Sequence, residues 1–143
     1  MKYDDASWHY GGEFPKELPS EAGATHIGMF VAWCLLNGLG SDFHVKEMPD
    51  LLAHLKAKRL TPGAFFIKAC DEKFTDEDLS PDGNAFAKSY YEAKDAEYIG
   101  DYEAALGADV PTLYHVTDTW ENYERLAPAI AKRYAAWRKK ANQ

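Results

Sequence analysis

The 143-residue sequence has no stretch of 18 apolar residues, and only two of its residues are cysteine. A membrane-spanning helix needs about 20 apolar residues, so we expect no association with a membrane. Cys34 and Cys70 stand apart in no ligand-like pattern, which argues against a disulfide scaffold or a zinc module. The segment from Met1 to Asp5 lacks the basic and apolar regions of a signal peptide. The sequence therefore predicts a cytoplasmic protein.

The composition is that of a folded domain. Apolar side chains make up 46% of the residues and aromatic ones 14%, a content that disordered chains do not have. At about 150 residues per domain, residues 1–143 form a single domain. The chain has 23 acidic and 16 basic residues and a net charge of −7, which repels phosphate. We therefore expect no nucleic acid as a partner.

Residues 1–19 predict an irregular N-terminal arm that is rich in aromatic residues. Tyr3, Trp8, Tyr10 and Phe14 lie there among glycines and prolines. Four exposed aromatic side chains would leave a large apolar patch on the surface. We therefore expect the arm to pack on the domain, with Trp8 and Phe14 buried.

Helical periodicity and capping residues predict a mainly α, compact domain of several helices. The first helix is apolar on most sides and places Trp33 in the core, so we expect it at the centre of the fold. Gly100 is a point of interruption in a long predicted helix, and Pro128 should bend or divide the last one. At most a minor strand is expected, near 112–116. The predicted helical segments are 20–38, 49–59, 61–69, 75–79, 84–107 and 119–137.

The charge is unevenly distributed along the chain. The segment Asp71–Glu103 holds eleven acids and three lysines, a net −8, whereas Arg125–Lys140 holds six bases and no acid. One interpretation is that both segments are solvated helix faces that partly neutralise each other. The other is that the acidic segment docks a basic partner, with tyrosines as anchors inside a charged rim. The predicted contact residues are Asp76, Glu77, Asp78, Asp82, Tyr91, Glu92, Asp95, Glu97, Tyr98, Asp101 and Tyr102.

Metal and cofactor motifs are incomplete or missing from the sequence. The run from Asp78 to Gly83 has the first half of a calcium loop, but position 12, which must supply a glutamate, is Ser89. We therefore expect a turn here and no bound calcium. The sequence also has no pair of histidines in zinc-binding helical spacing and no phosphate-binding glycine loop. It predicts neither a metal ion nor a cofactor.

The histidines are the remaining candidates for chemistry. His26 lies on the apolar first helix and is expected to be a hydrogen-bonded core residue, whereas His44 and His54 lie among surface-like residues. His9 follows Asp4 and Asp5, and His115 precedes Asp118. A carboxylate that orients an imidazole can make a general base. Neither histidine belongs to a known nucleophile motif, so we do not expect an enzyme.

Several stretches resemble a family of small bacterial proteins that open with the run YDDASWHY and a following Phe-Pro. That family is similar to the acidic immunity proteins that accompany polymorphic bacterial toxins, and the resemblance brings no catalytic residues. It implies an immunity protein that binds and neutralises a cognate toxin with a basic surface. The alternatives are a small enzyme or ligand-binding protein using His9, His26 or His115 with Asp4 and Asp5, and a regulatory module with another protein partner. The stretches are 3–10, 14–15, 24–30, 70–79, 83–87 and 114–123.

Overall fold

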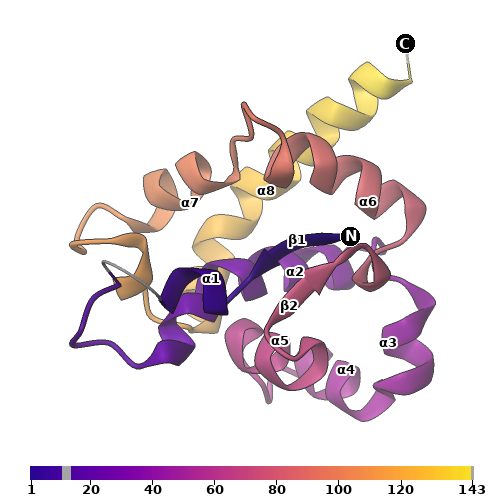
Figure 1. Ribbon diagram of the computed structural model, residues 1–143. Helices are drawn as coiled ribbons and strands as arrows, with labels where there is room; N and C mark the ends of the chain where they lie inside the picture. Colours follow the sequence, from indigo (N-terminus) through magenta and orange to yellow (C-terminus); the bar gives the residue numbers. More distant parts are fainter. Residues whose placement is uncertain (11–13, 143) are drawn as a thin grey trace.

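A central apolar helix organises the fold (Figure 1). The computed structural model describes residues 1–10 and 14–142. The central helix α2 (Thr25–Leu36) follows a short 3₁₀ turn, η1 (Ser20–Ala24), and every one of its residues before Leu36 is buried. Trp33 is only 3% exposed. The expectation of a first helix at the centre of the core is confirmed.

Helix α2 packs closely and extensively against α5 (Pro62–Cys70). Gly28 of α2 makes it possible, since a Cβ there would lie 2.7 Å from the carbonyl oxygen of Pro62. Phe65 and Phe66 of α5 are fully buried in the same core. Thr61 caps α5 by accepting a hydrogen bond from the amide of Ala64, as the Thr-Pro start predicts.

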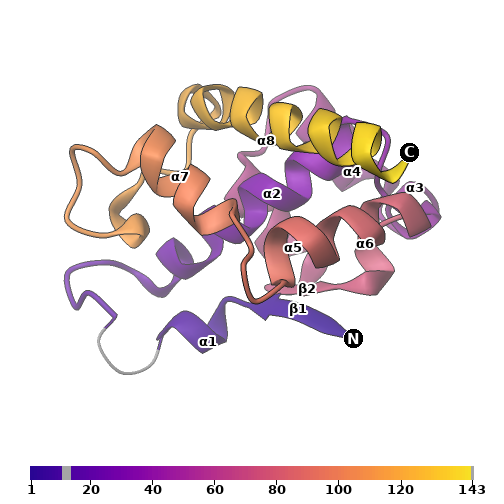
Figure 2. The ribbon, with the colours of Figure 1, turned by 90° about the horizontal axis from the view of Figure 1, so that it is seen from above.

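The remaining helices cover α2 from several sides. Figure 2 shows α8 on one side of α2 and the first strand on the opposite side. Ser80 and Thr119 cap the helices that follow them, and proline opens α4 and α6. The mainly α fold is therefore confirmed. These helices are α1 (Ser7–Tyr10), α3 (Asp42–Glu47), α4 (Pro49–Lys56), α6 (Pro81–Ala87), α7 (Tyr98–Leu106) and α8 (Trp120–Ala141).

A two-stranded antiparallel sheet lies in a place the sequence did not predict. Strand β1 (Lys2–Asp5) pairs with β2 (Lys73–Thr75), with a bulge between Lys2 and Asp4. The strand expected near 112–116 is wrong, because Leu113–His115 forms a 3₁₀ turn, η4, capped by Thr112. A local sequence pattern cannot reveal a pairing between segments so far apart in the chain.

The predicted helix over 84–107 is also wrong, because the chain bends between α6 and α7. A π-helical turn, η3 (Lys88–Glu92), follows α6, and Ala93 then adopts an extended conformation. The amide of Glu97 donates back to the carbonyl of Tyr90 at 3.2 Å, which holds the bend. Gly100 lies inside α7 and does not interrupt it.

Pro128 does not divide α8, which runs unbroken from Trp120 to Ala141. Proline removes one helical hydrogen bond, and its cost is lower on a solvent-facing side, where water can bind the freed carbonyl. Pro128 is exposed. Among the described residues, no helix combines the length and the apolar character that crossing a bilayer requires.

The N-terminal arm packs on the domain, but not as expected in detail. Tyr3 and Ala6 are buried, whereas Trp8 is 58% exposed and Phe14 is only partly buried against Tyr114. The expectation of a buried Trp8 is wrong, because the single turn of α1 directs this side chain outward. Gly11 and Gly12, which the expected arm includes, lie outside the described residues.

Candidate functional site

The exposed acids of the predicted contact set fall into two groups. In the first group, residues pair with the basic helix α8: Arg133 contacts Glu97 at 2.7 Å and Asp101 at 2.9 Å, and Arg138 contacts Asp82 at 3.3 Å. The two charged segments thus neutralise each other in part. The second group makes no ion pair with α8. It consists of Asp76, Glu77, Glu92 and Asp95.

Asp76 and Glu92 both lie within electrostatic range of Tyr3 in the first strand. Burial of the Tyr3 hydroxyl and the negative charge of these two carboxylates raise the pKa of Tyr3 to about 12. Asp76 belongs to the 3₁₀ turn η2 (Asp76–Asp78) and contacts the amino group of Met1 at 3.1 Å. We call the exposed residues Asp76, Glu77, Glu92 and Asp95 the acidic face, of which Asp76 and Glu92 act electrostatically on Tyr3 of β1.

The tyrosine anchors of the predicted contact set are wrong. Tyr98 and Tyr102 are at most 1% exposed, and Tyr91 is largely covered while its hydroxyl donates to Asp4 Oδ2 at 2.6 Å. These rings belong to the aromatic core, where Tyr91 stacks on Tyr98 with centroids 5.1 Å apart. Positions 91, 98 and 102 are seven and four residues apart, a spacing typical of one helix face, and the structure turns these rings toward the core.

Asp78 is likewise buried and unavailable to a partner. Its Oδ1 atom lies 2.9 Å from His44 Nε2, and its Oδ2 atom accepts a hydrogen bond from the Thr75 amide. His44, expected at the surface, is 1% exposed because the short helix α3 turns it toward Asp78. The thiol of Cys70 approaches the same pair, and burial raises the pKa of this thiol.

One of two groups of closely spaced ligand-type side chains among the described residues is a histidine cluster, which we define as Asp4, His9 and His26. It joins β1, α1 and α2. His9 Nε2 lies 2.9 Å from Asp4 Oδ1, and His26 Nε2 lies 3.8 Å from Asp4 Oδ2. On its other side, His9 Nδ1 lies 2.7 Å from the hydroxyl of Tyr114 in η4.

His26 has an unusual environment for a buried histidine. The side chain is 1% exposed, and neither ring nitrogen has a hydrogen-bond partner among the described residues. The expectation of a core position is confirmed, but that of a hydrogen-bonded ring is wrong. Burial, with the nearby His9, lowers the pKa of His26 to about 3, so the ring is neutral at physiological pH.

Asp4 supplies the negative charge of the cluster. Burial alone would raise the pKa of its carboxyl, but hydrogen bonds from His9 and Tyr91 outweigh that effect and lower the pKa below 3.8. The amide of Asp5 donates a further hydrogen bond to Asp4 Oδ1 at 2.8 Å. The cluster therefore combines an ionised carboxylate with a neutral imidazole that has no other partner.

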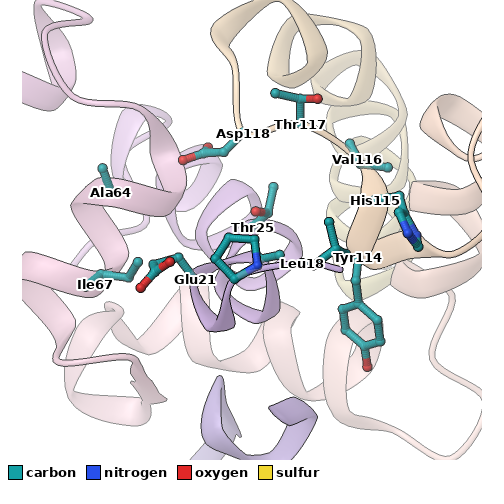
Figure 3. Close-up of a pocket in the computed structure, with 12 residues that line it drawn as sticks. Leu18, Glu21, Thr25, Ala64, Ile67, Tyr114, His115, Val116, Thr117 and Asp118 are labelled. Carbon is teal, nitrogen blue, oxygen red and sulfur yellow. The ribbon is translucent and has the colours of Figure 1, made fainter. Parts of the chain in front are cut away.

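A separate cavity of about 390 Å³ lies between α5, η1 and η4. Figure 3 shows the carboxylate of Asp118 directed toward it and the ring of Tyr114 turned away. Asp118 accepts hydrogen bonds from the Gly63 amide at 2.9 Å and from the Thr61 hydroxyl. His115 lines the cavity, but His9 and His26 do not.

The structure thus brings together only some of the histidines and aspartates that the sequence suggested as one site. His9 and His26 meet at Asp4, whereas His115 contacts Glu17 at 2.7 Å. Asp5 forms its own pair with Lys2 at 2.8 Å. Proximity in sequence pointed to Asp4 with His9, but no sequence signal pointed to Tyr91 or Tyr114 as their hydrogen-bond partners.

The described fold is a small helical domain with a buried histidine cluster and an acidic face. Residues 2–116 match the family model of a domain of unknown function, DUF7832, and the chain belongs to this family. The matched span includes the whole histidine cluster and ends before α8. No curated protein and no solved structure matches the chain.

Proposed function

We propose that the protein is a cytoplasmic immunity protein that binds and neutralises an antibacterial toxin with a basic surface. The observation that supports this most is the set of exposed carboxylates Asp76, Glu77, Glu92 and Asp95, none of which pairs with α8, together with the exposed ring of Trp8 in α1, which follows β1. An aromatic anchor within a charged rim is the arrangement that gives tight and specific protein contacts. Trp8 takes the role that the sequence had assigned to Tyr98 and Tyr102.

The position of Trp8 relative to the strand supports this proposal. The ammonium group of Lys2 lies 5.3 Å from the centre of the Trp8 ring, so Trp8 adjoins β1. The neighbouring Met1 is 59% exposed and contacts Asp76 of the acidic face. Burying a large aromatic ring contributes most when surrounding contacts exclude water from it.

The charges of the face set the kinetics of the proposed encounter. Glu77, Glu92 and Asp95 make no ion pair within the described residues, so their charge is available to a partner. Attraction between opposite charges speeds association and is screened over about 10 Å at 0.1 M salt. We therefore expect the rate of toxin binding to fall as the salt concentration rises.

The test is binding of the purified protein to the products of its neighbouring genes, measured by surface plasmon resonance. Glu77→Lys combined with Glu92→Lys should reduce the association rate, and Trp8→Ala should mainly raise the dissociation rate. Glu103→Lys, on the exposed side of α7, is the matched charge control and should change neither rate by more than about twofold.

Growth rescue in cells that express the toxin gives the corresponding functional readout. The wild-type protein should protect, and the double charge reversal should protect less. The proposal fails if the wild-type protein binds no neighbouring gene product at micromolar concentration. It also fails if the reversals on the acidic face and the Glu103→Lys control have the same effect.

A second candidate is a small ligand-binding protein or enzyme, which the meeting of His9 and His26 at Asp4 favours. The cavity in Figure 3 does not reach these residues, however, and His115 stands apart from them. A shift in melting temperature with small molecules that His9→Gln abolishes would support this candidate over toxin binding.

A further inference from the structure

We propose that Asp4, His9 and His26 bind one divalent transition-metal ion. This inference does not depend on the proposed toxin binding. The three residues each offer one ligand atom, and these atoms all lie within 4.8 Å of one another. Two imidazoles and one carboxylate are a ligand set that zinc and iron(II) use in proteins.

The distances in the histidine cluster are compatible with such an ion. Around a tetrahedral zinc, with bonds of about 2.0–2.1 Å, neighbouring ligand atoms lie about 3.3 Å apart. The separations of the two imidazole nitrogens from the carboxylate oxygens of Asp4 are 2.9 Å and 3.8 Å, which lie on either side of that value. All three ligand atoms lie within 4.8 Å of one another, so side-chain movements of up to about 1.5 Å bring them to the separations of a tetrahedral ion.

The buried ring of His26 has no hydrogen-bond partner among the described residues, and this is an independent observation that points to a ligand. Buried polar atoms in native proteins almost always have a hydrogen-bond partner, and each exception calls for an explanation. Both nitrogens of His26 are exceptions, and Nε2 faces the ionised carboxylate of Asp4. A cation between these two groups would provide the missing partner for the imidazole.

The surrounding hydrogen bonds suit metal ligands. Histidines that bind a metal usually use their second ring nitrogen for a hydrogen bond that fixes the ring. With Nε2 of His9 on the ion, the proton resides on Nδ1 and is donated to the hydroxyl oxygen of Tyr114, 2.7 Å away. Tyr91 similarly fixes Asp4 by donating to Oδ2. Three protein ligands leave a further coordination position for water or a small ligand.

A second group of possible ligands provides an internal comparison. His44, Cys70 and Asp78 also bring their ligand atoms within 4.8 Å of one another. In that group Nε2 of His44 already contacts Asp78 Oδ1, and only its Nδ1 lacks a partner among the described residues, whereas both ring nitrogens of His26 lack one. The histidine cluster is therefore the stronger candidate, and variants of Cys70 separate the two sites.

For the test, the full-length chain is first treated with a chelator. It is then titrated with Zn²⁺, and binding is measured by isothermal titration calorimetry. We expect one ion per chain, bound at micromolar concentration or below, and a rise in melting temperature. His9→Gln and Asp4→Asn should each weaken binding by about 100-fold or more, and Tyr114→Phe by about 10-fold. Cys70→Ser should leave the affinity unchanged.

Cobalt(II) absorption and controls for folding make each outcome decisive. The expected spectrum lacks a thiolate-to-cobalt band, because the proposed site has no cysteine ligand. His9 is partly exposed, so His9→Gln remains informative if a variant of buried Asp4 does not fold. The proposal is overturned if the folded wild-type protein binds none of Zn²⁺, Co²⁺ and Fe²⁺. It is also overturned if Cys70→Ser abolishes binding while His9→Gln retains it.

Discussion

Replacing Gly28 by alanine tests the close contact between α2 and α5. The added Cβ would lie 2.7 Å from the carbonyl oxygen of Pro62 and 2.9 Å from Cα of Gly63. These are backbone atoms in the first turn of α5, so no side-chain rotation relieves the overlap. One of the two helices must move, although α2 is buried along nearly its whole length.

The expected magnitude follows from two opposing effects. Overpacking a core costs about 1–3 kcal/mol, and overlap with backbone atoms places this site near the upper value. Alanine is favoured over glycine in a helix by about 1 kcal/mol, which offsets part of the cost. Gly28→Ala should therefore lower the free energy of unfolding by about 2 kcal/mol.

Gly100→Ala in α7 is the matched control. Outside its own stretch of helix backbone, a Cβ built at Gly100 meets no described atom within 4 Å, so this variant should gain about 0.5–1 kcal/mol. Urea unfolding followed by tryptophan fluorescence measures both variants against the wild-type protein. The reasoning is refuted if Gly28→Ala is as stable as the wild-type protein, or if the two substitutions shift stability in the same direction.

Three further predictions concern substitutions of single residues, and a fourth concerns calcium. Trp33→Ala should cost about 3–5 kcal/mol in urea unfolding as a core truncation, and a loss below about 1 kcal/mol would contradict its buried position. Trp8→Ala should change stability by less than about 0.5 kcal/mol, because its ring is mostly exposed, and a larger loss would mean that it packs on the fold. Burial raises the pKa of Asp101, but hydrogen bonds from Arg133 and Tyr90 outweigh this and hold the pKa below 3.8. The wild-type protein should thus exceed Asp101→Asn in stability by about 1 kcal/mol at pH 7, discounted because Arg133 is partly exposed. This difference should vanish as the pH falls through the folded-state pKa of Asp101, and one that persists at pH 2 would refute the assignment. Calcium should leave the melting temperature unchanged, because Asp78 is already engaged by His44 and Thr75, and a rise of several degrees would contradict this.

Elements with strong local signals are those that the sequence predicts well. The apolar run in α2 has no polar side to expose, so its burial follows from the residues themselves. The caps at Thr61 and Thr119 lie where the sequence places them, because a cap depends only on the next few residues. Ser80, which the sequence places in a turn, instead caps α6, which begins at Pro81.

The sequence could not predict features that depend on contacts between residues far apart in the chain. The residues of β1 form a strand only because β2 provides hydrogen bonds to them. Backbone hydrogen bonds from Ala96 to Ala93 and from Glu97 to Tyr90 hold the bend between α6 and α7, and no glycine or proline in the sequence indicates it. Tyr98 therefore lies inside the core, whereas a continuous helix would have left its orientation open.

The candidate site shows the same division. Asp4 and His9 are close in sequence, and their pairing was foreseeable. His26 joins them only through the packing of β1 and α1 against α2. His44 was expected at the surface because its neighbours are polar or exposed, and only the contact between α3 and η2 reveals its pairing with Asp78.

The contacts of the first ten residues also determine when this part of the protein can fold. Tyr3 bonds to a residue 81 positions later, Asp4 to one 87 positions later, and His9 to one 105 positions later. At translation rates of about 5–20 residues per second, Tyr114 leaves the ribosome about 5–20 seconds after His9. Throughout that interval β1 has no complete set of partners, and its closure is delayed by the large loop that must be ordered first. The N-terminal segment therefore docks late when the chain folds during its synthesis. The assembly of Asp4, His9 and His26 depends on this docking and is late as well.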